Sequence, residues 1–116
     1  MRLGATPTIS VVVASTSAVQ VLEDLLLILE PQCRESGTEL VVARAASDDL
    51  AELELRSRFP SVLFTDSESN NDLAQLRVDG LRSATGDIVA ITEDHRSLPN
   101  NWVSQIVRRD QRDVTA

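Results

Sequence analysis

The chain has 116 residues, which is enough for one compact domain and too few for two. It carries 18 acidic residues against 11 basic ones, every one of them arginine, so the net charge is −7, and 42% of the side chains are apolar. The apolar fraction excludes wholesale disorder, and the acidic balance argues against binding to nucleic acid or to anionic lipid.

The cellular compartment and the lack of a membrane segment are predicted from features that are missing from the sequence. Its single cysteine, Cys33, cannot form an internal disulfide and is most simply a small buried or half-buried thiol. The N-terminus lacks the apolar core of a signal peptide. The longest apolar runs, residues 25–29 and 88–91, are far shorter than a membrane span. We therefore expect a cytoplasmic protein with no membrane segment.

The first strand and helix are predicted from apolar spacing. Residues 9–14 are rich in β-branched side chains, which is typical of a buried strand. Ser17 and Gln20 have the spacing of a capping box, so we expect a helix to begin there. Its apolar stripe consists of Val19, Leu22, Leu25, Leu26 and Leu29. Pro31 is expected to end or kink this helix, and Gly37 to form the turn beyond it.

The second strand is predicted at residues 39–43. A weaker helix should follow and run to about Phe59, where Pro60 stops it. We expect Leu50 and Leu53 on its inner face. The candidate caps of this helix are Ser47, Asp48 and Asp49.

The second half of the chain is predicted to continue the alternation of strands and helices. Residues 62–65 predict a short third strand, and residues 87–92 a fourth. The helix between them should be closed by Gly86, and its apolar stripe consists of Leu73, Leu76, Gly80, Leu81 and Ala84. A last helix is expected after Pro99, with Trp102, Ile106 and Val107 facing inward. Residues 108–116 are expected to form a polar tail.

Alternating strands and helices predict an α/β fold. Right-handed crossovers would give a Rossmann-like three-layer sandwich, a mainly parallel sheet of about four strands with helices on both faces, as a single domain over residues 1–116. Ligands of such sheets bind beyond the carboxyl ends of the strands. Three loops should lie there: residues 15–16, 44–49 and 93–98.

These loops lack a glycine-rich phosphate motif, a nucleophile elbow and the acidic pair of a phosphorylated receiver domain. The informative residues are Glu93 and His95. Side chains two apart at a strand end point the same way, so this carboxylate and this imidazole could share a divalent cation, with the imidazole favouring Mn²⁺ over Mg²⁺. The alternative is a solvated acidic turn.

Several segments together resemble the nucleotide-sugar-binding half of family 2 glycosyltransferases. They are residues 9–16, 39–49, 76–87, 93–95 and 99–102. Within them, residues 76–80 match the family's Ala-Arg-Asn-x-Gly segment, residues 93–95 its Asp-x-Asp motif and residues 99–102 its Pro-x-x-Trp. The resemblance implies a GT-A fold, a nucleotide-diphosphate-sugar donor and usually a divalent metal.

The resemblance also implies which residues form the donor site. They would be Ala14, Ser15, Thr16, Arg44, Ser47, Arg77, Glu93 and Asp94. The metal, Mn²⁺ or Mg²⁺, would be held by His95 and Glu93. No catalytic residue is implied.

Three positions depart from the family pattern. Arg44 stands where the family has a base-binding Asp, which reverses the local charge and favours phosphate over uridine. His95 replaces the second Asp of Asp-x-Asp, and Val78 replaces the Asn of Ala-Arg-Asn.

Each candidate also has a structural alternative. Arg77 is expected to form an ion pair with Asp79 or Asp72, and Ser47 to cap the second helix. Trp102 is expected to anchor the core or an interface.

The family's acceptor half, which carries the general base, comes after the Asp-x-Asp segment, whereas this chain ends at Ala116. Asp110 and Asp113 are expected at a solvated helix end. We therefore expect a donor-binding domain that is inactive alone. The competing hypothesis is a degenerate, non-catalytic interaction module. Under that hypothesis an exposed sheet edge on the fourth-strand side, near Trp102, would form a homodimer.

Overall fold

The structure, a computed structural model, describes residues 8–68, 72–94 and 97–115, with side chains as far as residue 108. Strands and helices alternate along the described chain. In order they are β1 (Ile9–Ser15), α1 (Val19–Ser36), β2 (Glu39–Ala45), α2 (Leu50–Arg58), β3 (Leu63–Ser67), α3 (Leu73–Ser83), β4 (Ile88–Glu93) and α4 (Trp102–Thr115). The predicted alternation is confirmed. None of the described helices has the length and apolar character needed to cross a bilayer.

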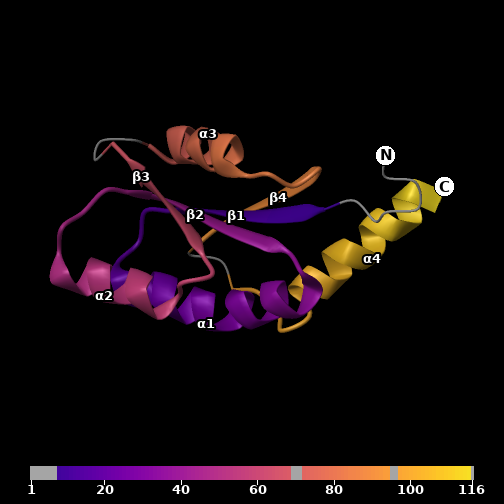
Figure 1. Cartoon of the computed structure of the whole chain (residues 1–116), viewed down its shortest axis with the longest axis horizontal. Helices are drawn as coiled ribbons and strands as arrows, with labels where there is room; N and C mark the ends of the chain where they lie inside the picture. Colours follow the sequence, from indigo (N-terminus) through magenta and orange to yellow (C-terminus); the bar gives the residue numbers. More distant parts are fainter. Residues whose placement is uncertain (1–7, 69–71, 95–96, 116) are drawn as a thin grey trace.

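The four strands form one parallel sheet in the order β3-β2-β1-β4. Figure 1 shows α3 over one face, with α1, α2 and α4 along the other. This confirms the α/β, Rossmann-like three-layer sandwich. The chain moves outward from β1 through β2 to β3 and then returns to the other side of β1. The strand order therefore reverses between β1 and β4, the place where such sheets bind ligands.

The core surrounds β1, which is buried along its whole length. The larger cluster lies between the sheet and α1, and includes Val11, Val13, Leu22, Leu26 and Leu29. On the other face α3 approaches the sheet closely, because a Cβ at Gly80 would overlap Val12 Cγ1. That approach places the carboxyl end of β1 between α1 and α3.

Helix α1 differs from its prediction at both ends. The capping box is wrong: Ala18 is the N-cap, without a side-chain bond, and Ser17 is used elsewhere. Pro31 lies inside the helix and does not end it; Gly37 ends it, at φ 63°. The turn after Pro31 is held by Gln32, whose Oε1 accepts from Val103 N at 2.9 Å and whose Nε2 donates to Pro99 O.

Cys33 lies in that last turn and is buried, as expected. Burial, followed by the nearby charge of Glu30, raises the pKa of its thiol to about 12. The thiol therefore stays protonated and unreactive near neutral pH.

The prediction for the inner face of α2 is wrong. Leu50 and Leu53 are 69% and 49% exposed, whereas Glu52 and Leu55 are buried. The buried positions continue to Phe59 with helical spacing. In this phase the helix buries Leu55 and Phe59 and brings Glu52 to an arginine on β2.

The end of the chain also differs. Val103 is fully buried, while Trp102 and Val107 pack partly buried against the same core. Helix α4 continues through most of the predicted polar tail, to Thr115. The expectation for Asp110 and Asp113 lies beyond the described side chains.

At the amino ends of the strands, Glu39 ties β2 to its neighbours. Its carboxylate accepts from Ser10 Oγ at 2.6 Å and from Thr85 N at 2.9 Å and Thr85 Oγ1 at 3.1 Å. Burial acts to raise the pKa of Glu39, but these hydrogen bonds outweigh it and hold that pKa below 4.5.

This shift predicts a pH-dependent contribution to stability. The folded-state pKa is depressed, so the contribution is present above the unfolded value and is lost as pH falls through the folded pKa. Glu39→Gln keeps an acceptor oxygen but cannot ionise. We expect it to lower the free energy of unfolding in urea at neutral pH, with the deficit shrinking below pH 4.5. Glu35→Gln, on an exposed part of α1, is the control; an identical pH profile for both variants would contradict the prediction.

Candidate functional site

The carboxyl edge of the sheet gathers polar residues from three strands. In the register of the sheet Ser15 pairs with Arg44, and Ala14 pairs with Glu93. Asp94 comes directly after Glu93. Topology therefore brings together residues that are up to 79 positions apart in the sequence.

Asp94 joins the loop after β4 to the loop after β1. Its Oδ2 accepts from Ser15 Oγ at 2.6 Å and from Ser17 N at 3.0 Å. Its Oδ1 accepts from Ser17 Oγ at 2.8 Å. The side chain is only 1% exposed. This carboxylate therefore bridges β1 and β4 at the point where the strand order reverses.

Arg44 extends the same set of contacts to β2 and α2. Its Nε donates to both oxygens of Glu52, at 2.9 and 3.0 Å. Its Nη1 donates to Ser15 Oγ and to Ser17 O, each at 2.7 Å, and lies 4.0 Å from Asp94 Oδ2. We call Ser15, Ser17, Arg44, Glu52 and Asp94 the buried ionic network.

The network is buried, and its two carboxylates face one guanidinium within it and a second from outside it. The side chains of Arg44 and Glu52 are 11% and 4% exposed. A second guanidinium, that of Arg56, reaches Glu52 Oε2 at 3.1 Å. Two arginines thus face the carboxylates of Glu52 and Asp94, which limits the cost of burying them.

Arg77 forms an ion pair with Glu93, a partner that its sequence neighbours Asp79 and Asp72 did not suggest. This pair joins α3 to the end of β4 because both residues lie on the α3 face of the sheet. It lies beside an open hollow of about 430 Å³, which we call the β4 hollow. That hollow is lined by Arg77, Ile91, Thr92, Glu93, Leu98 and Trp102.

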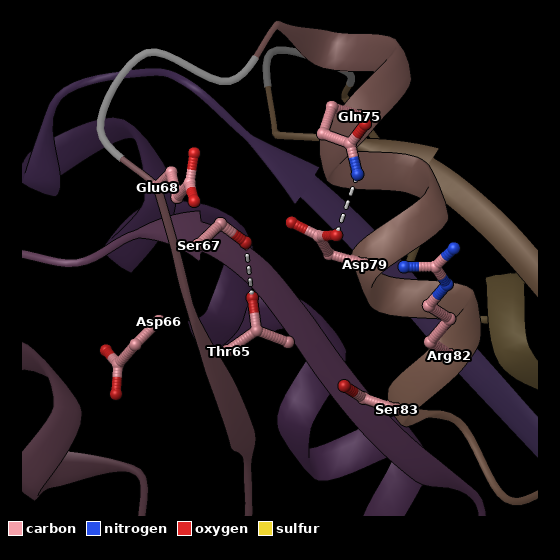
Figure 2. Close-up of a pocket in the computed structure, with 8 residues that line it drawn as sticks. All are labelled: Thr65, Asp66, Ser67, Glu68, Gln75, Asp79, Arg82 and Ser83. Carbon is pink, nitrogen blue, oxygen red and sulfur yellow. Dashed lines mark hydrogen bonds between the residues drawn. The ribbon is translucent and has the colours of Figure 1, made fainter.

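A separate polar hollow of about 590 Å³ lies between β3 and α3 (Figure 2). Thr65 and Ser67 share a hydrogen bond on the strand side, and Gln75 donates to Asp79 on the helix side. The rest of its lining is Asp66, Glu68, Arg82 and Ser83. None of the predicted donor-site residues lines it.

The predicted donor site is therefore divided. Ser15, Arg44 and Asp94 meet in the buried ionic network, whereas Arg77 and Glu93 line the β4 hollow. The remaining predicted residues belong to neither group: Ala14 is fully buried, Thr16 is exposed, and Ser47 accepts from Asp49 N at 3.1 Å. Asp49, the N-cap, accepts from Ala51 N.

The metal prediction rests on Glu93 and His95, and His95 lies outside the described residues. Within the described part of the chain no group of three or more His, Cys, Asp or Glu side chains could hold a metal ion. Glu93 pairs with Arg77, and Asp94 could reach a cation only by leaving its buried hydrogen bonds. Both carboxylates are thus already engaged by groups of the protein, and a metal site at Glu93 and His95 stays a prediction.

Sequence reasoning does not find two members of the network, Ser17 and Glu52. Ser17 has the spacing of a capping box, although its hydroxyl donates to Asp94. Glu52 is missed because Leu50 and Leu53 are expected to form the inner face of the helix. A usable signal is present: Glu52, Leu55 and Phe59 have the i, i+3, i+7 spacing of one helix face.

No protein-family model matches this chain, and no curated protein matches it significantly.

Removing one partner of the network should be costly. Arg44→Met leaves Asp94 without its cation and Glu52 with Arg56 alone, and we expect a loss of about 3 kcal/mol in the free energy of unfolding, measured in urea. The double variant Arg44→Met/Glu52→Leu should recover part of that loss, because the pair of charges is removed together.

The matched control is Arg58→Met, which removes an arginine from the same helix as Glu52. Arg58 pairs with Glu23 at the surface, so its loss should cost less than about 1 kcal/mol. Equal losses for Arg44→Met and Arg58→Met would contradict the importance given to the network.

Proposed function

We propose that this chain is the nucleotide-diphosphate-sugar-binding domain of a family 2-like glycosyltransferase. The observation that supports it best is the meeting of Ser15, Arg44 and Asp94 at the reversal point between β1 and β4. These are motif positions of the resemblance, and they lie at the edge where parallel α/β sheets bind nucleotides.

The β4 hollow is the accessible part of this edge, and we infer that the donor binds there. Its volume of about 430 Å³ suits a small-molecule ligand. Arg77 is 42% exposed at its side chain and is the cation available to a diphosphate there. Glu93 orients Arg77, and Trp102 and Leu98 supply apolar surface. Thr16 is exposed at the adjoining end of β1.

The proposed activity is donor binding and not transfer. Transfer needs a general base against the acceptor hydroxyl. The two carboxylates next to the hollow are engaged, Glu93 with Arg77 and Asp94 in the buried ionic network.

Donor binding can be tested by NMR titration with a panel of nucleoside diphosphates and nucleotide sugars. We expect saturable shifts of the amides of residues 15–17, 77 and 93–94. Arg77→Met should weaken binding about tenfold or more, because a hydrogen bond to a charged group is worth about 1.5–3 kcal/mol. Arg58→Met, which removes the same charge elsewhere, should bind as the wild type does. Silence across the whole panel would overturn the proposal.

A second candidate, a self-associating interaction module, is favoured by the edge of β4. In the described part of the chain β4 pairs only with β1. It carries no Lys or Pro that would protect an edge, and Ile91 is 40% exposed. Two copies could pair β4 antiparallel about a two-fold axis, with Trp102 beside the contact.

Light scattering tests this second candidate. We expect a concentration-dependent dimer that Ile91→Lys converts to a monomer, because a charge at the edge disfavours strand pairing. Leu27→Lys places the same charge on an exposed leucine of α1 and should leave the dimer intact. A wild-type chain that stays monomeric at high concentration would exclude the module.

A further inference from the structure

The polar hollow between β3 and α3 takes no part in the proposed donor binding, since none of its residues lines the β4 hollow (Figure 2). Helix α3 lies close to β1 and β2, where a Cβ at Gly80 would meet Val12 and Ala43, and the hollow is the space left between this helix and the outer strand β3. Its volume of about 590 Å³ is in the range of small-molecule sites.

Glu68 and Arg82 are two opposite charges of this hollow that the protein leaves free. Glu68 follows the end of β3 and Arg82 is in the last turn of α3; both residues are exposed, and neither side chain forms a hydrogen bond or an ion pair with the described residues. Figure 2 shows the two at opposite ends of the hollow. The other carboxylates are engaged, because Asp66 pairs with an arginine of α2 and Asp79 accepts from Gln75 at 3.0 Å. The hollow therefore offers a free carboxylate at one end and a free guanidinium at the other.

A hydroxyl pair lines the strand side of the hollow. Thr65 Oγ1 and Ser67 Oγ are 3.1 Å apart and share one hydrogen bond, and Thr65 Oγ1 also accepts from Arg44 N. Each hydroxyl carries one hydrogen. The second hydrogen of the pair therefore has no acceptor among the described residues, although Ser67 is only 6% exposed. A nearly buried donor without a partner favours a ligand that brings an acceptor, such as an amide carbonyl.

We propose that this hollow binds a short peptide whose two termini are free. Its ammonium group pairs with Glu68 and its carboxylate with Arg82. An amide carbonyl between them accepts the spare hydrogen of the hydroxyl pair. A simple anion such as phosphate would instead meet the carboxylates of Glu68 and Asp79. The site is separate from the proposed donor site, so the two proposals stand independently.

The probe is glycylglycine, titrated into the whole chain and followed by NMR at low ionic strength, where exposed charges are least screened. We expect saturable shifts of the amides of residues 65–68 and 82–83. Glycine, whose two charges are adjacent, and the N-acetylated and C-amidated forms of the dipeptide should each bind about fivefold more weakly, as the loss of one exposed ion pair implies.

Three results of this titration would overturn the proposal. They are equal binding of all four compounds, shifts confined to residues 15–17, 77 and 93, and no saturable shift at all. Phosphate and inositol are titrated in the same way. Tighter binding of either one than of glycylglycine at these amides would overturn the proposal in favour of an anion site or a polyol site.

Two variants assign the two termini of the peptide. Arg82→Met should remove the preference for a free carboxylate, so that glycylglycine and its amide bind alike, and should keep the preference for a free amine. Glu68→Gln should remove the preference for a free amine and keep the other. The matched controls Arg34→Met and Glu35→Gln change the same charges at exposed positions of α1 and should keep both preferences. A preference that survives the loss of its own charged partner would overturn the proposal.

Discussion

The pairing of Arg44 with Glu52 is the contact on which the carboxyl edge of this sheet depends. It attaches β2 to α2 through the interior, and the same guanidinium reaches Ser15 and Ser17 after β1. Those two residues in turn hold Asp94 after β4. One arginine therefore organises the ends of three neighbouring strands. A buried charge persists only where its partners hold it, so Ser15, Ser17 and Asp94 are held in place together with Arg44.

Under the proposed function, structural and ligand-binding demands would compete for the same groups. Asp94 stabilises the meeting of two loops, and the hydrogen bonds that do so occupy its oxygens. Arg77 and Glu93 neutralise each other in a more open position. The edge thus has a buried part, which is the buried ionic network, and an accessible rim formed by Arg77 and Glu93. Under the proposed function, affinity would come from the accessible rim, where Arg77 lies.

The order of strands and helices was predictable because apolar periodicity is a local property. The meeting of the loops after β1, β2 and β4 was also predictable, since parallel strands end at one edge. The errors concern residues whose placement depends on a distant partner. Glu52 faces inward, where it pairs with Arg44, and the Ser17 hydroxyl donates to Asp94 in place of capping a helix. Pro31 lies within α1, whose next turn is hydrogen-bonded to the start of α4 through Gln32. The local spacing of residues does not predict such pairings between distant positions.

That anchor has a mechanical consequence. The Gln32 amide accepts from Val103 N and donates to Pro99 O, so α1 is hydrogen-bonded to both sides of the start of α4. Trp102 lies between these two contacts in the chain and forms one wall of the β4 hollow. The position of that wall therefore depends on α1, on the opposite face of the sheet from α3, as well as on β4.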